Sequence, residues 1–83
     1  MPTTRVSRRA TKDLGRLAKA YLGAVAAALR GLAESPLDGK PLGGDLAGLR
    51  SRRVGMYRIV YRYDPREQVV DVIWIRHRRE AYR

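Results

Sequence analysis

The segments Tyr57-Arg-Ile-Val-Tyr-Arg-Tyr63 and Val69-Val-Asp-Val-Ile-Trp-Ile75 decide the fold class of this 83-residue chain. Both segments are rich in β-branched and aromatic residues, which favour extended strands. Between them, Asp64-Pro65-Arg66-Glu67 suits a β-turn, with Asp at the first position and Pro at the second. Gly55 marks another reversal before Tyr57. From Leu49 onward, the sequence therefore predicts three antiparallel strands.

The residues before Leu49 predict one strand and two helices. Thr3 to Val6 is a short β-branched segment, and Ser7 after it is suited to cap the N-terminus of a helix. Apolar residues then recur at helical spacing in two groups, namely Ala10, Leu14, Leu17 and Tyr21, then Leu22, Val25, Leu29 and Leu32. Gly15 and Gly23 could each mark the boundary between the two helices.

Ser35-Pro36 ends the second helix, because the residue before a proline is disfavoured in helical geometry. Residues 37–48 contain four of the eight glycines and predict a loop, with Leu42 and Leu46 as anchors into the core. The order of elements predicts an α+β fold: an N-terminal strand, a helical hairpin, then three antiparallel strands, forming one four-stranded sheet with the helices on one face. At this length we expect a single domain over residues 1–83.

The charge of the chain is strongly positive. Eighteen Lys and Arg, of which fifteen are Arg, face eight Asp and Glu, giving a net charge of +10. Arg grips phosphate through two hydrogen bonds, so this composition indicates a nucleic acid or an acidic protein partner. A genome rich in G and C, which favours Arg codons, is an alternative explanation.

Composition also excludes several classes of protein. The chain has no cysteine, which removes disulfides and thiolate chemistry and is typical of a cytoplasmic protein. The longest apolar run, residues 20–29, is half of the roughly 20 residues that a membrane span needs, so we expect neither a span nor a targeting segment. Zinc-finger, phosphate-loop and serine-hydrolase patterns are missing, and the sequence predicts no metal and no cofactor.

Alternation along the strand from Tyr57 separates two faces of the predicted sheet. One face carries the tyrosines and Ile59, which can cover the helices, and the other carries Arg58 and Arg62. Arg50, Arg52 and Arg53 lie on the preceding strand, and the segment 76–83 leaves the last strand beside them. An Arg-rich face of this kind predicts a cradle for a polyanion, although a solvated face of an antiparallel sheet is the alternative.

Two side chains near the C-terminus are candidates for proton transfer. His77 is the only histidine, and histidine titrates near neutral pH. Tyr82 could transfer a proton or stack on a base. The alternative for both is a structural role.

Several stretches of this chain resemble the RelE/ParE toxin superfamily. They are TTRVSRRATKDLGRL (residues 3–17), LAESP (32–36), KPLGGDLAGLRSRRVGMYRIVYRYD (40–64) and IRHRREAYR (75–83). The last two are the specific ones, since family members read like K-x-L-x-G-x-L-x-G-L-W-R-x-R-V-G-x-Y-R-x-x-Y and end like H-R-x-x-V-Y.

The resemblance to the RelE-like mRNA interferase branch implies a toxin of a type II toxin–antitoxin pair. It implies a ribosome-dependent, metal-independent endoribonuclease in which the 2′-hydroxyl of the mRNA attacks the adjacent phosphate. It also implies partners, namely an acidic antitoxin, the ribosome and mRNA. The catalytic residues implied are Arg58, His77, Arg78 and Tyr82. The residues expected to bind RNA are Arg50, Arg52, Arg53, Arg62, Arg76 and Arg79.

The chain departs from the family pattern at two points. Arg50, Arg52 and Arg53 stand where some members have Lys, and Arg50 follows Leu49 where Trp is common. Arg stays protonated and is a poor base, so the residue that removes the proton is left open. Two other functions stay open as well: a ParE-like toxin that inhibits DNA gyrase without cutting RNA, and a catalytically degraded toxin fold that only binds.

Overall fold

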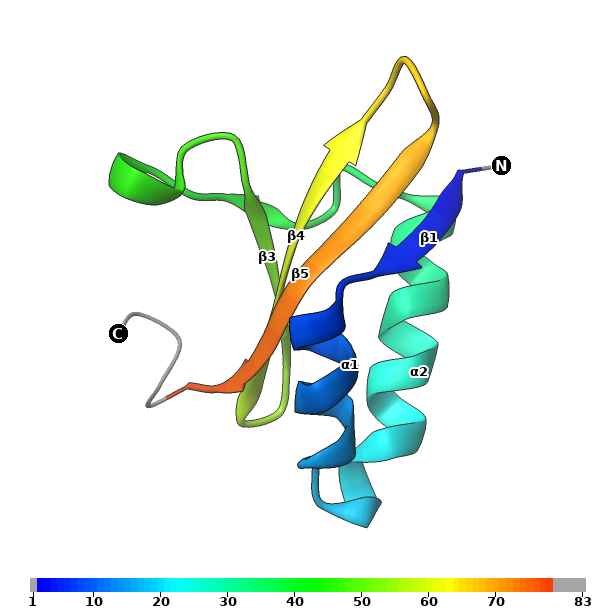
Figure 1. Ribbon diagram of the computed structural model, residues 1–83, viewed down its shortest axis with the longest axis vertical. Coiled ribbons are helices and arrows are strands. Elements are labelled where there is room, and N and C mark those ends of the chain that lie inside the picture. Colours follow the sequence, from blue (N-terminus) through cyan, green and yellow to red (C-terminus); the bar gives the residue numbers. More distant parts are fainter. Residues whose placement is uncertain (1, 79–83) are drawn as a thin grey trace.

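The computed structural model of the chain describes residues 2–78. Its elements are β1 (Thr3–Val6), α1 (Arg8–Gly15), α2 (Lys19–Glu34), β2 (Lys40–Pro41), the 3-10 helix η1 (Gly44–Leu46), β3 (Arg50–Val54), β4 (Tyr57–Asp64) and β5 (Val69–His77). Figure 1 shows α1 and α2 side by side along the same side of the sheet. No helix among these residues is long and apolar enough to cross a membrane.

The sheet has five strands in the order β1-β5-β4-β3-β2. β1 runs parallel to β5, and all the other neighbours are antiparallel. The α+β class and the three antiparallel strands are confirmed, but the expected count of four strands is wrong. The additional strand is Lys40–Pro41, which pairs with Arg50 and Ser51 inside the segment expected to be a loop. A two-residue strand that contains a proline shows no alternation of apolar and polar residues and has the composition of a turn. The sequence pattern therefore does not predict it as a strand.

Ser7 starts α1 as expected. Its Oγ accepts a hydrogen bond of 3.0 Å from the Ala10 N–H, which satisfies one of the unpaired donors at the helix start. α1 ends at Gly15 and α2 begins at Lys19, so Gly15 marks the boundary and Gly23 lies within α2. Tyr21 therefore belongs to the second helix and not to the first.

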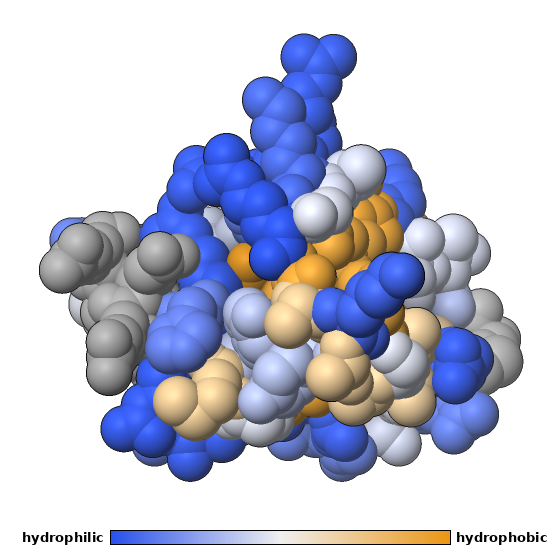
Figure 2. Space-filling view, turned by 90° about the horizontal axis from the view of Figure 1, so that it is seen from below, coloured by the Kyte–Doolittle hydropathy of each residue, from blue (hydrophilic) through white to orange (hydrophobic). Residues whose placement is uncertain are grey.

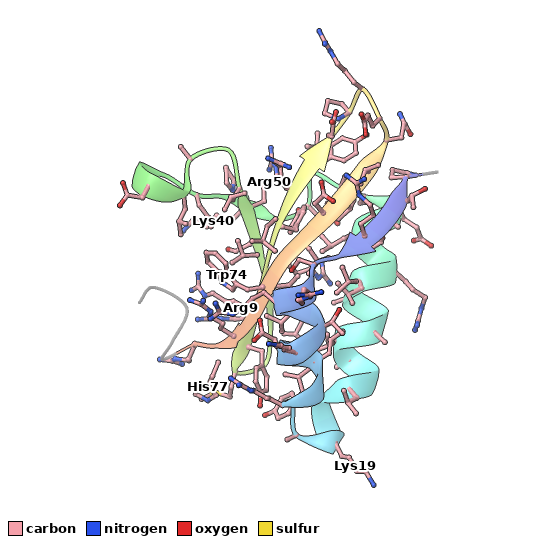
Figure 3. All side chains as sticks on the ribbon, in the orientation of Figure 1. Arg9, Lys19, Lys40, Arg50, Trp74 and His77 are labelled. Carbon is pink, nitrogen blue, oxygen red and sulfur yellow. The ribbon has the colours of Figure 1, made fainter. Side chains whose placement is uncertain are left out.

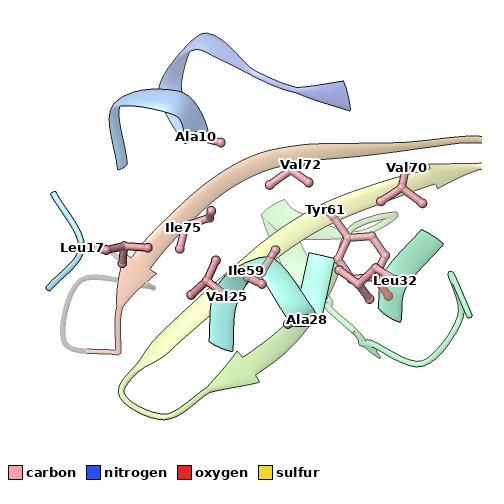
Figure 4. Packing of buried hydrophobic residues seen from close by; sticks show 10 residues of the cluster. All are labelled: Ala10, Leu17, Val25, Ala28, Leu32, Ile59, Tyr61, Val70, Val72 and Ile75. Carbon is pink, nitrogen blue, oxygen red and sulfur yellow. The ribbon is translucent and has the colours of Figure 1, made fainter. Parts of the chain in front are cut away.

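The core lies between the helices and one face of the sheet (Figure 4). Its buried members are Ala10, Leu17, Val25, Ala28, Leu32, Ile59, Tyr61, Val70, Val72 and Ile75. The Tyr61 hydroxyl accepts a hydrogen bond from the Gly39 N–H (2.9 Å) and donates one to the Pro36 carbonyl (2.7 Å). A side chain at Gly39 would collide with the Tyr61 ring, so the glycine lets the loop pack on this tyrosine. Leu42 and Leu46, the expected anchors, are half-buried.

Some apolar surface stays exposed outside this core. The large apolar side chains that remain accessible are Val6, Leu22, Leu37 and Met56. Seen from below, hydrophilic side chains dominate the margin of the molecule and apolar ones show near its middle (Figure 2). Scattered exposure of this kind is normal for a small domain.

Where β1 ends, the side chains of Ser7, which caps α1, and of Asp13 in α1 make hydrogen bonds to the backbone of β5. The pairing of β1 with β5 stops at Val6 and Val72. Beyond that point the Ser7 Oγ donates to the Ile73 carbonyl (2.7 Å), and the buried Asp13 accepts a 2.9 Å hydrogen bond from the Ile75 N–H at its Oδ2. These two side chains therefore complete the outer edge of β5 without a longer β1.

β5 contains one extra residue relative to β4. Val60 pairs with Trp74 but the next residue, Tyr61, pairs with Val72, so Ile73 has no counterpart. This is a β-bulge, which shifts the alternation of side chains by one residue. As a result Val72 and Ile75 both enter the core, whereas Trp74 points to the opposite face.

Candidate functional site

The face of the sheet away from the helices, called the outer face below, carries a row of three arginines. Arg53 on β3 is paired with Arg58 on β4, which in turn is paired with Arg76 on β5. Residues paired directly across antiparallel strands point to the same face and lie close together. Like charges placed directly opposite one another destabilise a sheet. A bound anion would relieve this repulsion, so the row is suited to bind one.

A pocket of about 270 Å³ adjoins this row and is lined by Lys40, Ser51, Arg53 and Arg58. Lys40 reaches it because β2 pairs Lys40 with Ser51 on the edge of the sheet. Figure 3 shows Lys40 on the side of the strands away from the helices. Among residues 2–78, three cations and a hydroxyl line the pocket and no carboxylate does, so it suits a phosphate group.

Trp74 lies on the same face, one row further along the strands. It is paired with Val60, which is paired with Ser51. The Cζ atom of Arg76 lies 4.5 Å from the centre of the Trp74 ring, which is a cation–π contact. Val60 is only 2% exposed beneath these side chains.

Arg62, another expected RNA-binding residue, also lies on the outer face but is held by a carboxylate. Its Nη2 is 3.6 Å from Asp71 Oδ2. Asp71 also accepts two hydrogen bonds from Arg5, of 2.9 and 3.2 Å. The Arg5 guanidinium lowers the pKa of the Asp71 carboxyl below its ordinary value, with Arg62 contributing less. This end of the face is therefore a mixed-charge cluster and differs from the purely cationic pocket.

Arg50 and Arg52 lie on the opposite side of β3 from Arg53. Arg50 is paired with the buried Tyr61, and its Nη1 donates to the carbonyls of Leu37 (3.2 Å) and Gly39 (2.8 Å). Arg52 is paired with the buried Ile59. Of the three arginines expected on this strand, the structure brings only Arg53 to the face that carries Arg58.

His77 lies on the helix side of the sheet, at the end of β5. It is paired with Tyr57, and the two rings meet edge to face with centres 5.7 Å apart. Tyr57 in turn contacts Tyr21 of α2, with ring centres 5.0 Å apart. A pocket of about 210 Å³ beside them is lined by Asp13, Arg16, Leu17, Tyr57, Ile75, Arg76 and His77. Thus His77 and Arg58 are on different faces of the sheet.

The remaining expected residues lie at or beyond the end of β5. Arg78 is exposed, and its backbone N–H donates to the Met56 carbonyl. Arg79 and Tyr82 fall outside the described residues.

Lys40, Trp74 and Asp13 have notable positions that the sequence expectations did not assign. Lys40 enters the pocket through the short β2, and Trp74 reaches the outer face through the bulge. Asp13 binds β5 from α1. The only signal in the sequence for Asp13 was a carboxylate inside an otherwise basic helix start.

Comparisons with known proteins agree on the family. Residues 4–82 match the family described as ParE toxin of type II toxin-antitoxin system, parDE. The chain is 40% identical to Toxin RelG of Mycobacterium tuberculosis over 83 residues, which covers 98% of this chain and 95% of that protein. A segment of 45 residues is 49% identical to Toxin RelE of the same organism, covering 54% of this chain and 46% of the relative.

Solved structures give the same result. The toxin–antitoxin complex RelBE2 from Mycobacterium tuberculosis contains a chain with a TM-score of 0.85 and 38% identity, and the match covers 93% of this chain and 99% of that one. The YoeB/ParE toxin from Agrobacterium tumefaciens has a TM-score of 0.78 and 26% identity, over 90% of this chain and 96% of that one. The chain therefore belongs to the RelE/ParE superfamily, the toxins of type II toxin–antitoxin systems.

Proposed function

We propose that this toxin is a ribosome-dependent endoribonuclease that cuts mRNA without a metal ion. The observation that carries the proposal is the pocket of Lys40, Arg53 and Arg58 on the outer face, continued by Arg76 across the sheet. The pocket presents positive charge and hydrogen-bond donors to one phosphate, and the part of its lining that the structure describes holds no carboxylate that would repel the RNA.

The chemistry would use a nucleophile that the RNA itself provides. The 2′-hydroxyl attacks the adjacent phosphorus, the bond to the 5′-oxygen of the next nucleotide breaks, and a 2′,3′-cyclic phosphate and a 5′-hydroxyl result. The pentacoordinate phosphorane formed on the way carries more negative charge than the starting phosphodiester. Arg58 and Arg53, placed before the reaction begins, would stabilise that additional charge. Guanidinium groups act here through their charge and their N–H donors and not as bases.

We assign the proton transfer to Tyr82. To His77 we assign a positioning role, in which its ring holds the end of β5 against Tyr57. The assignment of Tyr82 comes from the family resemblance. That of His77 comes from its ring, which packs against Tyr57 on the helix side while Arg58 occupies the other face. In single-turnover cleavage at saturating ribosome, Tyr82→Phe should slow the reaction by about 10²–10⁴-fold, the usual contribution of a general acid or base. His77→Ala should leave the pH dependence of that rate unchanged.

We also propose an acidic antitoxin as the partner that keeps the toxin inactive. The net charge of +10 favours an acidic chain, and the RelBE2 relative is described as a toxin–antitoxin complex. Binding should weaken as salt rises, because added ions screen the exposed charges.

A second candidate function is inhibition of DNA gyrase without RNA cleavage. Two observations favour it: the matching family is described by its ParE toxins, and the only histidine of the chain does not face the cationic pocket. A gyrase poison needs no group for proton transfer, so the position of His77 away from the pocket would not reduce its activity.

One pair of experiments separates the two functions. Primer extension on a translated message after brief expression should show cuts within codons that require the ribosome. A DNA supercoiling assay with purified gyrase should show no inhibition. Inhibited supercoiling together with an intact message would replace the ribonuclease by the gyrase inhibitor.

A further inference from the structure

Trp74 is the single tryptophan of the chain, and it does not belong to the core. The core cluster lies on the helix side of the sheet, whereas Trp74 is partly exposed on the outer face. The largest aromatic side chain of the protein therefore lies on the face that carries the three arginines.

Arg76 connects this tryptophan to the phosphate pocket. Its guanidinium carbon lies 4.5 Å above the indole ring, and along the sheet Arg76 is paired with Arg58, which lines the pocket. Residues two apart on a strand are roughly 7 Å apart, so the indole lies about one side-chain row from the row of arginines. An arginine held over an aromatic ring is also restrained, which reduces the entropy lost when its other face meets a ligand.

A purely structural role for Trp74 explains part of this arrangement. Trp74 is paired with Val60, which is 2% exposed on the outer face, so the indole is in place to cover it. However, the Trp74 Nε1 is shielded from solvent and has no acceptor among residues 2–78. A buried donor without an acceptor is unfavourable, and a phenylalanine would cover Val60 without it. Covering Val60 therefore does not account for the choice of tryptophan.

We propose that Arg76 and Trp74 form a stacking platform for one unpaired RNA base, next to the phosphate bound by Arg53 and Arg58. The proposal rests on the proposed function in taking RNA as the ligand, and it adds a second contact to that site. Unpaired bases in RNA stack on aromatic rings and on guanidinium planes. The planar guanidinium of Arg76 would lie between the base and the indole, a position that a lysine cannot fill.

Two trinucleotides test this proposal directly. Both carry 2′-O-methyl groups, which block the attacking hydroxyl and prevent cleavage, and one of them has an abasic central position. Binding is measured by the anisotropy of a fluorescein on the RNA, and stacking by the emission of Trp74, which reports alone because no other tryptophan is present. The wild-type protein should bind the complete RNA at least about fivefold more tightly than the abasic RNA, the low end of the range for stacking one base. Only the complete RNA should change the emission of Trp74, because the stacked base would fix the Arg76 guanidinium over the indole.

Arg76→Lys is the decisive variant because it keeps the charge and removes the plane. Its affinity for the abasic RNA should stay within about twofold of wild type, while the preference for the complete RNA disappears. Arg66→Lys, on the exposed turn between β4 and β5, is the matched control and should keep the preference. Trp74→Leu should also lose the preference, and if it does not fold, Arg76→Lys alone decides.

Equal affinity of wild type for the two RNAs, or a preference that survives in Arg76→Lys, would overturn the platform. Either result leaves the ribonuclease proposal in place if primer extension shows cleavage. Conversely, a base preference in a protein that cuts no message would retain the platform and reject the ribonuclease.

Discussion

Replacing Arg58 by methionine should raise the stability of the toxin while it removes activity. Arg58 is at the centre of the row, directly opposite Arg53 on one side and Arg76 on the other. Methionine keeps an unbranched side chain of similar length that can cover the same apolar surface, but it carries no charge. The substitution therefore removes two directly opposed pairs of like charges and one phosphate-binding group together.

The size of both effects follows from this geometry. A cross-strand pair contributes roughly 0.2–1 kcal/mol, so relieving two repulsive pairs should stabilise the fold by about 0.4–2 kcal/mol at low salt. For a domain of this size that corresponds to a rise in Tm of roughly 2–16 °C. Loss of one charge-stabilising donor at a reacting centre typically costs about 10²–10³-fold in rate, and we expect a loss of that size in mRNA cleavage.

Thermal unfolding across a salt series checks the stability effect. Wild-type Tm should rise with NaCl because the ions screen the row, and the advantage of Arg58→Met should shrink over the same series. Arg66→Met, on the exposed turn, is the control and should change neither property. A variant that is inactive and also less stable than wild type by more than about 1 kcal/mol would refute the reasoning, because Arg58 would then hold the fold together.

Three further substitutions probe the scaffold behind the site. Tyr61→Phe leaves the buried Gly39 N–H without its acceptor and should cost about 1–3 kcal/mol in urea unfolding, whereas Tyr63→Phe, whose hydroxyl makes no such bond within residues 2–78, should cost less than about 0.5 kcal/mol. Asp13→Ala removes the acceptor of a β5 backbone N–H and should lower stability by about 1–3 kcal/mol; an unchanged urea midpoint would mean that water replaces the carboxylate. Arg5 lowers the pKa of the Asp71 carboxyl below 3.8 in the folded protein. The stabilisation that the Asp71 carboxylate gives is therefore present above pH 3.8 and is lost as the pH falls through the pKa of the folded state. Asp71→Asn should therefore be less stable than wild type at pH 7, and the difference should shrink as the pH is lowered below 3.8; a difference that does not shrink in acid would point to packing instead.

The sequence predicts those elements whose local signals agree with their surroundings. The turn after β4 forms as expected, and Asp64 Oδ1 accepts hydrogen bonds from the N–H groups of Arg66 (2.9 Å) and Glu67 (3.3 Å). Ser7 caps α1 for an equally local reason. β2 could not be predicted, because two residues that include a proline become a strand only when β3 is present to pair with them.

The candidate site also has parts that the sequence predicts and parts that it does not. Alternation along one strand places Arg58 opposite the core tyrosines, and the structure agrees. Extending that alternation around the hairpin would have separated Arg53 from Arg50 and Arg52, so this part was available from the sequence. The faces of the sheet on which Arg76 and His77 lie could not be predicted. They depend on the bulge at Ile73, which no local sequence signal indicates.

Because Ile73 lies opposite no residue of β4, the effect of a deletion in β5 depends on where it falls. Deleting Ile73 would remove the bulge and bring Trp74 directly after Val72, and Trp74 would still pair with Val60 and Arg76 with Arg58 on the outer face. Deleting Ile75 instead would pair Arg76 with Ile59 and His77 with Arg58, so an arginine would turn toward the helices and a histidine would turn outward. In a fold this small, the loss of one codon can therefore leave the outer face intact or change its chemistry, without altering any residue that remains.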